Sequence, residues 1–348
     1  MAGRRLRGFA AAAAAVAVAT LVSGCDVRWE TDPSSFPSPD EVTVARNSLA
    51  DAEAAVLEAA AEPGSDTDAV APGAAAAAQA HLDVLGGVYV AYPDAPSPSP
   101  SVSPAPKPTL AEAIAFARDT AEDVAASTDD ADLAFLARSI DLEWALRGLW
   151  AEREAATQDA ADAETAASAS PTPLPATEAD SPGDADPVWF PLADGSTVDA
   201  AGFVPTAATG LAQDALSGLV LAEDEARFAY ETLAAQEFAQ DRDAALARAV
   251  LHGERSDTLA ALLDADPRTP LYQLRDANLL DPDARSALER SLEIDLAARY
   301  SVLLDGATAA DAAWLLNASF DSYARAMSTE GFTAADLPTL PGLQVETG

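Results

Sequence analysis

The stretch LAEDEARFAYE, residues 221–231, indicates the class of fold and raises the first question about function. It lies in an alanine-rich region where apolar residues recur every three or four positions, as on one face of an α-helix. Glu223 falls on the same face as Leu216, Leu219 and Tyr230. A buried carboxylate without a partner is costly. Three roles are open for it: a metal ligand, one half of an ion pair, or an exposed residue beside the apolar face.

The same helical pattern covers most of the chain and predicts an all-α protein. Alanine has the highest intrinsic helix propensity, and nearly every segment between the proline-rich stretches has apolar residues at helical spacing. We expect two groups of four helices, and whether they share one core is open. The predicted helices lie near 41–62, 74–91, 110–126 and 130–165 in the N-terminal half, and near 206–239, 242–264, 283–304 and 308–327 in the C-terminal half.

Several predicted helix starts carry capping residues. Thr109 and Glu112 form the pattern of a capping box, in which the two side chains satisfy free backbone amides. Asp281 precedes Pro282, which is the arrangement of an N-cap followed by proline in the first turn. Thr308 is a weaker start of the last helix.

Composition divides the chain into regions. Residues 93–108 are rich in proline and serine, and proline lacks the amide donor that a helix interior needs. Residues 166–187 are rich in Pro, Ser, Ala and Asp and are predicted to be a disordered linker. The regions that remain are an N-terminal helical region at 40–92 and 109–165, a helical bundle domain at 188–327, and a C-terminal tail at 328–348.

The N-terminus has the three parts of an export signal. The basic start MAGRRLRGF (1–9) is followed by an apolar run that ends at Val22, and then by SGC (23–25). This series is typical of a secretory signal peptide, and the apolar run is shorter than the roughly 20 residues that a membrane-spanning helix needs. We therefore expect residues 1–24 to be a signal peptide that is removed on export.

The residues VSGC (22–25) resemble the lipobox of bacterial lipoproteins. Members of that family are cleaved before the cysteine, which then receives a diacylglyceryl group, so the resemblance implies lipidation of Cys25. Cys25 is the only cysteine in the 348 residues, which excludes an intramolecular disulfide. Two acyl chains suffice for stable attachment to a lipid bilayer. We expect residues 25–39 to be a tether and the protein to be lipid-anchored at the extracytoplasmic face of the cell membrane.

The chain is strongly acidic, which bounds its partners. Its formal net charge is −37, from 57 acidic and 20 basic side chains. Nucleic-acid binding requires a basic patch, and a surface of this charge repels the phosphate backbone. The composition therefore excludes a nucleic-acid partner, and we expect an unknown envelope protein or polymer in its place.

Two helices of the C-terminal half share one spacing of glutamate and tyrosine. Glu223 is followed by Tyr230 in the first helix, and Glu293 is followed at the same spacing by Tyr300 in the third. Residues seven apart lie two turns along on nearly the same face of a helix. His252 lies in the second helix, between the two pairs. Glutamate and histidine on neighbouring helices are the ligand types of metal sites inside helical bundles.

These residues resemble the ferritin-like superfamily, whose four-helix bundles hold two iron ions between inward-pointing glutamates and histidines. More closely, residues 206–327 are similar to an uncharacterised ferritin-like domain of actinobacterial proteins that are often secreted. The resemblance implies a ferritin-like four-helix bundle in the C-terminal half, beside a second group of helices in the N-terminal half. It is carried by Leu221-Ala222-Glu223 with Tyr230, by His252 with Arg255 and Asp257, by the loop PLYQL (270–274), and by Glu293 with Tyr300.

The ligand set departs from that of a di-iron site. A metal-binding second helix would carry a glutamate three residues before His252, where this chain has Ala249, and the fourth predicted helix has no histidine. Glu223, His252 and Glu293 remain as the candidate ligands of a reduced metal site. Asp321 is a further candidate.

An ion pair is the other explanation for a buried Glu223. Its partner would be a buried arginine such as Arg255 or Arg299, because a buried charge needs a counter-charge. If the metal site is only a relic, we expect Glu293→Leu to be tolerated or stabilising. His81, the second of the two histidines, is expected to be a core or helix-face residue.

The incomplete ligand set leads to the expected function. We predict a membrane-anchored extracytoplasmic lipoprotein whose helical bundle is metal-free, holds no cofactor and acts as a binding or structural module of the cell envelope. The incomplete set also argues against an enzyme. The alternative is an extracytoplasmic iron-binding or iron-oxidising protein with a reduced ferritin-like metal site.

Overall fold

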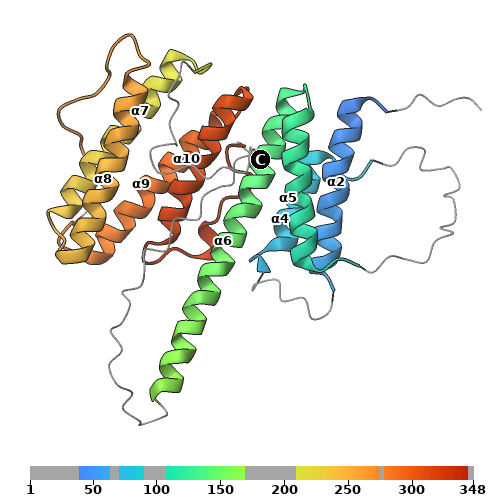
Figure 1. Cartoon of the computed structure of the whole chain (residues 1–348), viewed down its shortest axis with the longest axis horizontal. Helices are drawn as coiled ribbons and strands as arrows, with labels where there is room; N and C mark the ends of the chain where they lie inside the picture. Colours follow the sequence, from blue (N-terminus) through green and yellow to red (C-terminus); the bar gives the residue numbers. More distant parts are fainter. Residues whose placement is uncertain (1–38, 63–69, 90–106, 169–208, 275–277, 344–348) are drawn as a thin grey trace, which may run out of the picture. The chain divides into compact units, whose positions relative to one another are not determined.

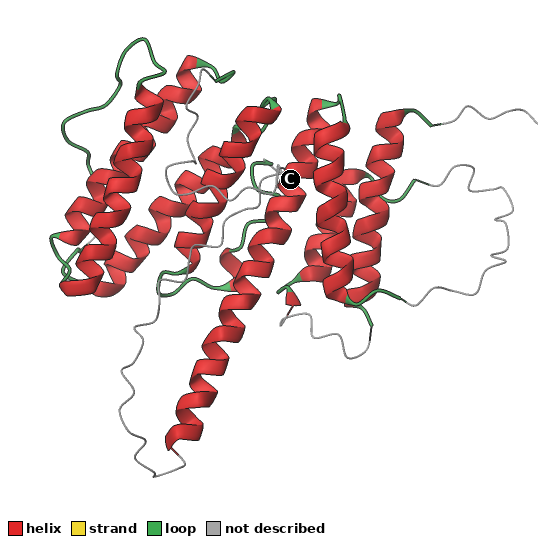
Figure 2. Cartoon of the chain, viewed as in Figure 1, coloured by secondary structure: helices red, strands yellow, loops and turns green. Residues whose placement is uncertain are grey.

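The computed structural model describes residues 39–62, 70–89, 107–168, 209–274 and 278–343 (Figure 1). Within these residues the chain is all-helical, with eight α-helices, one short 3-10 helix and no strand (Figure 2). The predicted all-α class is confirmed. None of the described helices combines the length and the apolar character needed to cross a membrane. The predicted signal peptide, Cys25, the tether at 25–39 and nearly all of the linker at 166–187 lie outside the described residues.

Four helices form the N-terminal half, close to their predicted bounds. The second is shorter than predicted, because Gly86 and Gly87 follow it with φ values of 82° and 76°, a conformation that favours glycine and ends a helix. The helices are α2 (Glu41–Ala60), α4 (Ala74–Leu85), α5 (Leu110–Ser127) and α6 (Ala131–Ser168).

Four more helices form the C-terminal half. The first begins later than predicted, because the residues before it bind the last helix instead: the hydroxyl of Thr209 and the amide of Gly210 both donate to Asp311. The helices are α7 (Gln213–Ala234), α8 (Ala239–Ala260), α9 (Pro282–Val302) and α10 (Ala309–Met327).

The predicted caps are confirmed at three helix starts. The Thr109 hydroxyl accepts from the amide of Glu112, whose carboxylate accepts from the Thr109 amide at 2.8 Å, which completes the capping box of α5. Asp281 accepts from the amide of Asp283 at the start of α9. Thr308 caps α10 in the same way. Each cap satisfies amide donors that the helix itself leaves free.

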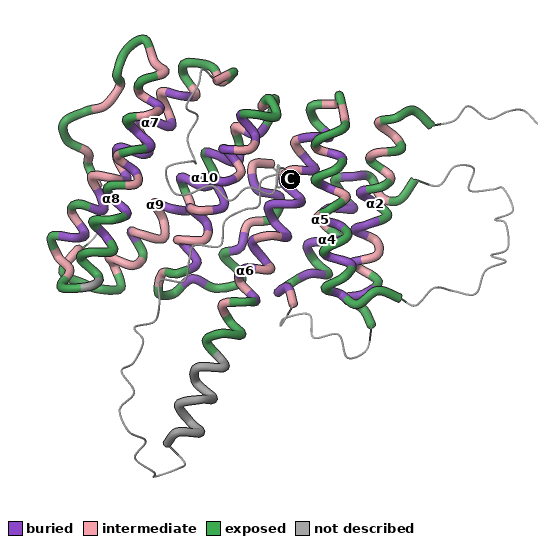
Figure 3. The backbone as a smooth tube through the Cα atoms, viewed as in Figure 1, coloured by how far each residue is buried: buried purple, intermediate pink, exposed green. Residues whose placement is uncertain are grey.

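Buried positions recur along every described helix (Figure 3), and the apolar residues among them form several cores. One core gathers buried residues of α2, α4, α5 and the first half of α6. Another gathers residues of α7, α8, α9 and α10. A third core contains Leu142, Leu146 and Leu149 of α6, which pack with residues of α9 and α10. Helix α6 is thus apolar on more than one side, as a central helix of a bundle is.

Residues 328–343, the first part of the predicted C-terminal tail, pack against the helices. Phe332 and Leu337 belong to the core that contains the middle of α6 and part of α10. Leu340 belongs to the N-terminal core and is 1% exposed. A short 3-10 helix, η3 (Ala334–Asp336), lies between Phe332 and Leu337.

Candidate functional site

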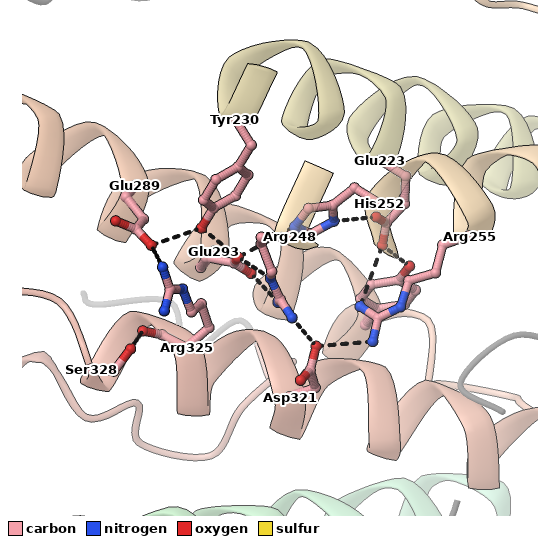
Figure 4. A network of polar contacts seen from close by, with 11 residues as sticks. Glu223, Tyr230, Arg248, His252, Arg255, Glu289, Glu293, Asp321, Arg325 and Ser328 are labelled. Carbon is pink, nitrogen blue, oxygen red and sulfur yellow. Dashed lines mark hydrogen bonds and ion pairs between the residues drawn. The ribbon is translucent and has the colours of Figure 1, made fainter. Parts of the chain in front are cut away.

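A network of buried polar side chains crosses the interior of α7–α10 (Figure 4). We call it the C-terminal network. Every helix of this half contributes, and the central members are fully buried or nearly so. The members are Glu223 and Tyr230 of α7, Arg248, His252 and Arg255 of α8, Glu289, Glu293 and Tyr300 of α9, and Asp321 and Arg325 of α10.

Glu223 is fully buried, which excludes an exposed position for it. Its Oε2 lies 2.6 Å from Nδ1 of His252, and its Oε1 accepts a short hydrogen bond from the hydroxyl of Tyr300. The nearest guanidinium nitrogen of Arg255 is 3.8 Å from the same carboxylate. Arg255 is thus one of its partners, as the ion-pair explanation predicts. The closest positive group is His252, which that explanation did not include.

Glu293 is the most heavily bonded carboxylate of the C-terminal network. Arg248 donates to both of its oxygens at 2.7 Å, and the hydroxyl of Tyr230 donates to Oε1 at 2.7 Å. Nε2 of His252 lies 3.3 Å from the same Oε1. The imidazole is therefore held between two glutamates that come from different helices.

Asp321 closes the network from α10. One of its oxygens accepts from Arg248 at 2.7 Å and from Arg255 at 2.9 Å. The two guanidinium groups therefore lie among the carboxylates of Glu223, Glu293 and Asp321.

The charges of these groups support one another. Burial raises the pKa of Glu293, but the charges of Arg248 and His252 lower it more, so that the pKa lies well below its ordinary value. Burial likewise raises the pKa of Glu223, and His252 and Arg255 lower it more. Burial raises the pKa of Tyr300 well above its ordinary value, so the hydroxyl keeps the proton that it donates. The carboxylates are thus ionised inside the protein.

Helix geometry explains how three cationic side chains meet these carboxylates. Arg248, His252 and Arg255 are spaced four and three residues apart, which places them on one face of α8. The sequence pattern singled out His252 and Arg255 but not Arg248. The spacing was the signal that could have found it, because a basic residue one turn from a buried histidine faces the same neighbours.

The other residues of the ferritin-like resemblance lie on the surface beside α7 and α8. The hydroxyl of Tyr272, in the loop at 270–274, donates to Asp224 at 2.7 Å. Arg268 pairs with Asp257 and Asp266. These contacts fasten the loop to the helices, outside the C-terminal network.

The arrangement of donors does not fit an iron ion. Both ring nitrogens of His252 face carboxylate oxygens, whereas a metal ligand needs a free nitrogen lone pair. Arg248 and Arg255 bring two positive charges among the carboxylates, and a further cation there would be repelled. In the described part of the chain no group of three or more His, Cys, Asp or Glu side chains is arranged to hold a metal ion.

Comparison of the chain with models of protein families, with curated proteins and with solved structures found no match. The resemblance to ferritin-like domains therefore rests on the quoted residues and stays a prediction. The site itself is defined by its geometry.

Proposed function

We propose that this protein is a lipid-anchored extracytoplasmic lipoprotein whose ferritin-like bundle is metal-free and acts as a binding or structural module of the cell envelope. The observation that carries the proposal is the position of Arg248 and Arg255 among the fully buried carboxylates of Glu223 and Glu293 and the partly buried carboxylate of Asp321. In a ferritin-like bundle metal ions lie between such carboxylates. Here the guanidinium groups supply the positive charge, which supports a scaffold rather than a redox centre.

The sequence supports the location. VSGC (22–25) follows a short apolar run, and Cys25 has no other cysteine to pair with. The net charge of −37 opposes adsorption to anionic lipid headgroups, so a covalent anchor is the physical means of holding this surface at a membrane.

Cys25→Ala is expected to abolish membrane attachment. Without the thiol no diacylglyceryl group can be added, and the acidic chain has no other anchor in this proposal. Membranes of cells that produce the protein are extracted with a detergent that separates into two phases, and the amount of the protein is measured in each phase. The wild type should enter the detergent phase and Cys25→Ala the aqueous phase. An equal distribution of the two proteins would contradict the lipid anchor.

A partner is sought with the anchored protein. Cross-linked complexes of the wild type and of Cys25→Ala are recovered from solubilised membranes and compared. An envelope component enriched only with the anchored form would support a binding role. Repeated recovery of the protein without a partner would count against it.

Incubation with ferrous iron is expected to leave no stoichiometric metal on the protein. Residues 26–348, made without tag histidines, are loaded without oxygen, desalted and analysed for iron. Because the surface is acidic, weak unspecific binding is controlled with Glu254→Ala, an exposed residue of α8. One iron per chain that is lost in Glu223→Ala, but kept in Glu254→Ala, would establish the iron-binding alternative.

A further inference from the structure

The N-terminal half has a buried charge centre of its own, which we call the His81 centre. Its members are Glu53 of α2, His81 of α4, and Glu143, Trp144 and Arg147 of α6, and all are buried. Nδ1 of His81 lies 2.9 Å from Glu53, and Nε2 lies 2.9 Å from Glu143. His81 is therefore a core residue, as predicted, and it is held between two carboxylates.

Three further groups bind the carboxylates of the His81 centre. The indole N–H of Trp144 donates to Oε1 of Glu53 at 2.9 Å. Arg147 donates twice to Oε1 of Glu143, at 2.9 and 2.7 Å. The backbone N–H of Leu340 donates to the other oxygen of Glu143 at 2.6 Å. Both oxygens of Glu143 thus accept hydrogen bonds, whereas Oε2 of Glu53 meets His81 only through the ion-pair contact at 2.9 Å.

The His81 centre has the same pattern of contacts as the C-terminal network around His252. In both, Nδ1 faces a glutamate from the first helix of its half, and Nε2 faces a second glutamate. An aromatic donor, Trp144 or Tyr300, binds the remaining oxygen of the first glutamate. An arginine, Arg147 or Arg248, donates twice to the second glutamate.

The helices that carry the first glutamate and the histidine correspond in chain order. Helices α2 and α7 both contain the pattern L-x-x-A-E, at 49–53 and 219–223. In both, the residues three and six positions after the glutamate are buried alanine or valine. The pattern of buried, half-buried and exposed residues is identical, position by position, in residues 74–81 of α4 and 245–252 of α8. Both segments end at the histidine.

The remaining helices correspond as well. The pattern of buried and half-buried residues is identical, position by position, in residues 133–142 of α6 and 311–320 of α10. Between residues 117–124 of α5 and 293–300 of α9, the pattern of burial differs at a single position. The fourth helix then continues in each half with an acid followed four residues later by an arginine: Glu143 and Arg147 in α6, Asp321 and Arg325 in α10.

We propose that the N-terminal half is a second copy of the four-helix unit of the C-terminal half, and that the His81 centre is the counterpart of the C-terminal network. An alanine-rich helix could match one other helix by chance. Four helices that match in the same chain order, with the first glutamate and the histidine at corresponding positions and in contact in both halves, are not explained by composition.

The differences between the two copies remove charges of opposite sign together. Ala117 of α5 stands where α9 has Glu293, and Ala77 of α4 stands where α8 has Arg248. A buried charge left without its partner is costly, so the loss of one requires the loss of the other.

In the N-terminal half, the second carboxylate at the histidine comes from the acidic residue of the fourth helix, Glu143, because the third helix has Ala117 in place of a glutamate. Glu143 is one methylene longer than its counterpart Asp321, and it contacts His81 directly, whereas Asp321 contacts only arginines among the cationic groups. The second carboxylate at the histidine thus comes from the fourth helix in one copy and from the third in the other.

The imidazole of His81 carries a positive charge in this arrangement. A nitrogen lone pair would be repelled by a carboxylate oxygen at 2.9 Å, so a proton lies on both ring nitrogens. Burial lowers the pKa of His81, but Glu143 and Glu53 raise it more, to about 9. Arg147 is the other charged group of the centre and pairs with Glu143. The centre then holds two carboxylates against two cations.

Nitrogen-15 NMR tests the His81 centre without any substitution, because the chain has only 2 histidines. The ring of His81 is identified by its contact with Trp144, whose ring centroid is 5.4 Å away. At pH 7 both ring nitrogens of His81 should carry a proton. Because the pKa is raised above its ordinary value of 6.5, the charge and its stabilising effect should be complete below that pH and be lost as the pH rises through about 9. A single protonated nitrogen at pH 7 would overturn the proposal.

A matched pair of variants on α2 tests the energetic role of the centre. Glu53→Gln should lower the melting temperature by roughly 6 °C or more, since it leaves a buried cation with half its counter-charge. Glu58→Gln, whose carboxylate is exposed and pairs with the exposed Lys107, should change it by less than about 2 °C. Glu223→Gln, the counterpart of Glu53→Gln in the C-terminal half, should lower the melting temperature by a similar amount to Glu53→Gln. Equal melting of Glu53→Gln and Glu58→Gln would show that the two halves do not share this centre.

Discussion

Glu293→Leu is expected to lower the free energy of unfolding by about 3–5 kcal/mol. The carboxylate of Glu293 accepts two hydrogen bonds from Arg248 and one from Tyr230, and it contacts His252. Leucine would leave the buried guanidinium with Asp321 alone and the imidazole with Glu223 alone. Removing one side of a buried pair is costly, because the other side keeps its charge without compensation.

This result is the opposite of the one expected for the relic of a metal site. If the interior carboxylates were idle after the loss of a metal, leucine would add apolar packing at no electrostatic cost. The contacts of Arg248 reverse that expectation, because the Glu293 carboxylate accepts two of the arginine's hydrogen bonds and balances its buried charge together with Asp321. The two outcomes differ in sign, so one denaturation series separates them.

Urea denaturation of residues 26–348 measures the effect. Glu254→Leu is the matched control, because Glu254 is exposed on α8 and the same substitution there should change stability by less than about 0.5 kcal/mol. The double variant Arg248→Met with Glu293→Leu should recover part of the loss, since both charges leave together. A Glu293→Leu protein as stable as the wild type would mean that the network is not needed for folding.

Much of the fold could be predicted from local sequence. Alanine-rich segments with apolar residues at helical spacing predicted the helices, and Thr109, Asp281 and Thr308 marked three starts correctly, because caps depend on neighbouring residues. The bounds failed where a distant contact decides. The first predicted helix of the C-terminal half included residues 209–212, but Thr209 and Gly210 bind Asp311 instead.

The candidate site could be predicted only in part. Glu223, His252 and Glu293 share buried helix faces, and the structure brings them together. Spacing could place Arg248 on the same face of α8 as His252. It could not show which carboxylates Arg248 meets, because Glu293 and Asp321 reach it only through tertiary packing. Glu53 and Glu143 meet His81 for the same reason, from helices far apart in the chain.

The packed C-terminal segment is the clearest failure of pattern reading. Phe332, Leu337 and Leu340 follow neither a helical nor a strand period, so the sequence predicted a tail. Each of the three side chains is buried by packing into a core that the helices form, and not by a repeating pattern within the segment itself. Gly342 shows how close the approach is: it has φ of 89°, and a Cβ there would collide with the carbonyl of Ser301.

Ending the chain at Gly331 is expected to cost at least roughly 6 kcal/mol, counting about 2 kcal/mol for each of three lost buried side chains. Phe332, Leu337 and Leu340 are at most 7% exposed, so their removal uncovers apolar surface on α6 and α10 and in the N-terminal core. The truncation also removes the Leu340 amide from Glu143, whose other bonds hold His81. Thermal unfolding should therefore occur at a much lower temperature.

A chain that ends at Leu343 is the control, because it keeps every described contact of the segment. It should melt like the full chain. Nitrogen-15 NMR of the chain that ends at Gly331 then separates the loss of apolar burial from the loss of the Leu340 hydrogen bond. If His81 keeps both protons while the protein melts early, the loss is apolar burial alone. If one proton is lost at pH 7, the Leu340 amide is needed to keep Glu143 in place beside the histidine. A chain ending at Gly331 that melts within about 2 °C of the control would contradict a structural role for this segment.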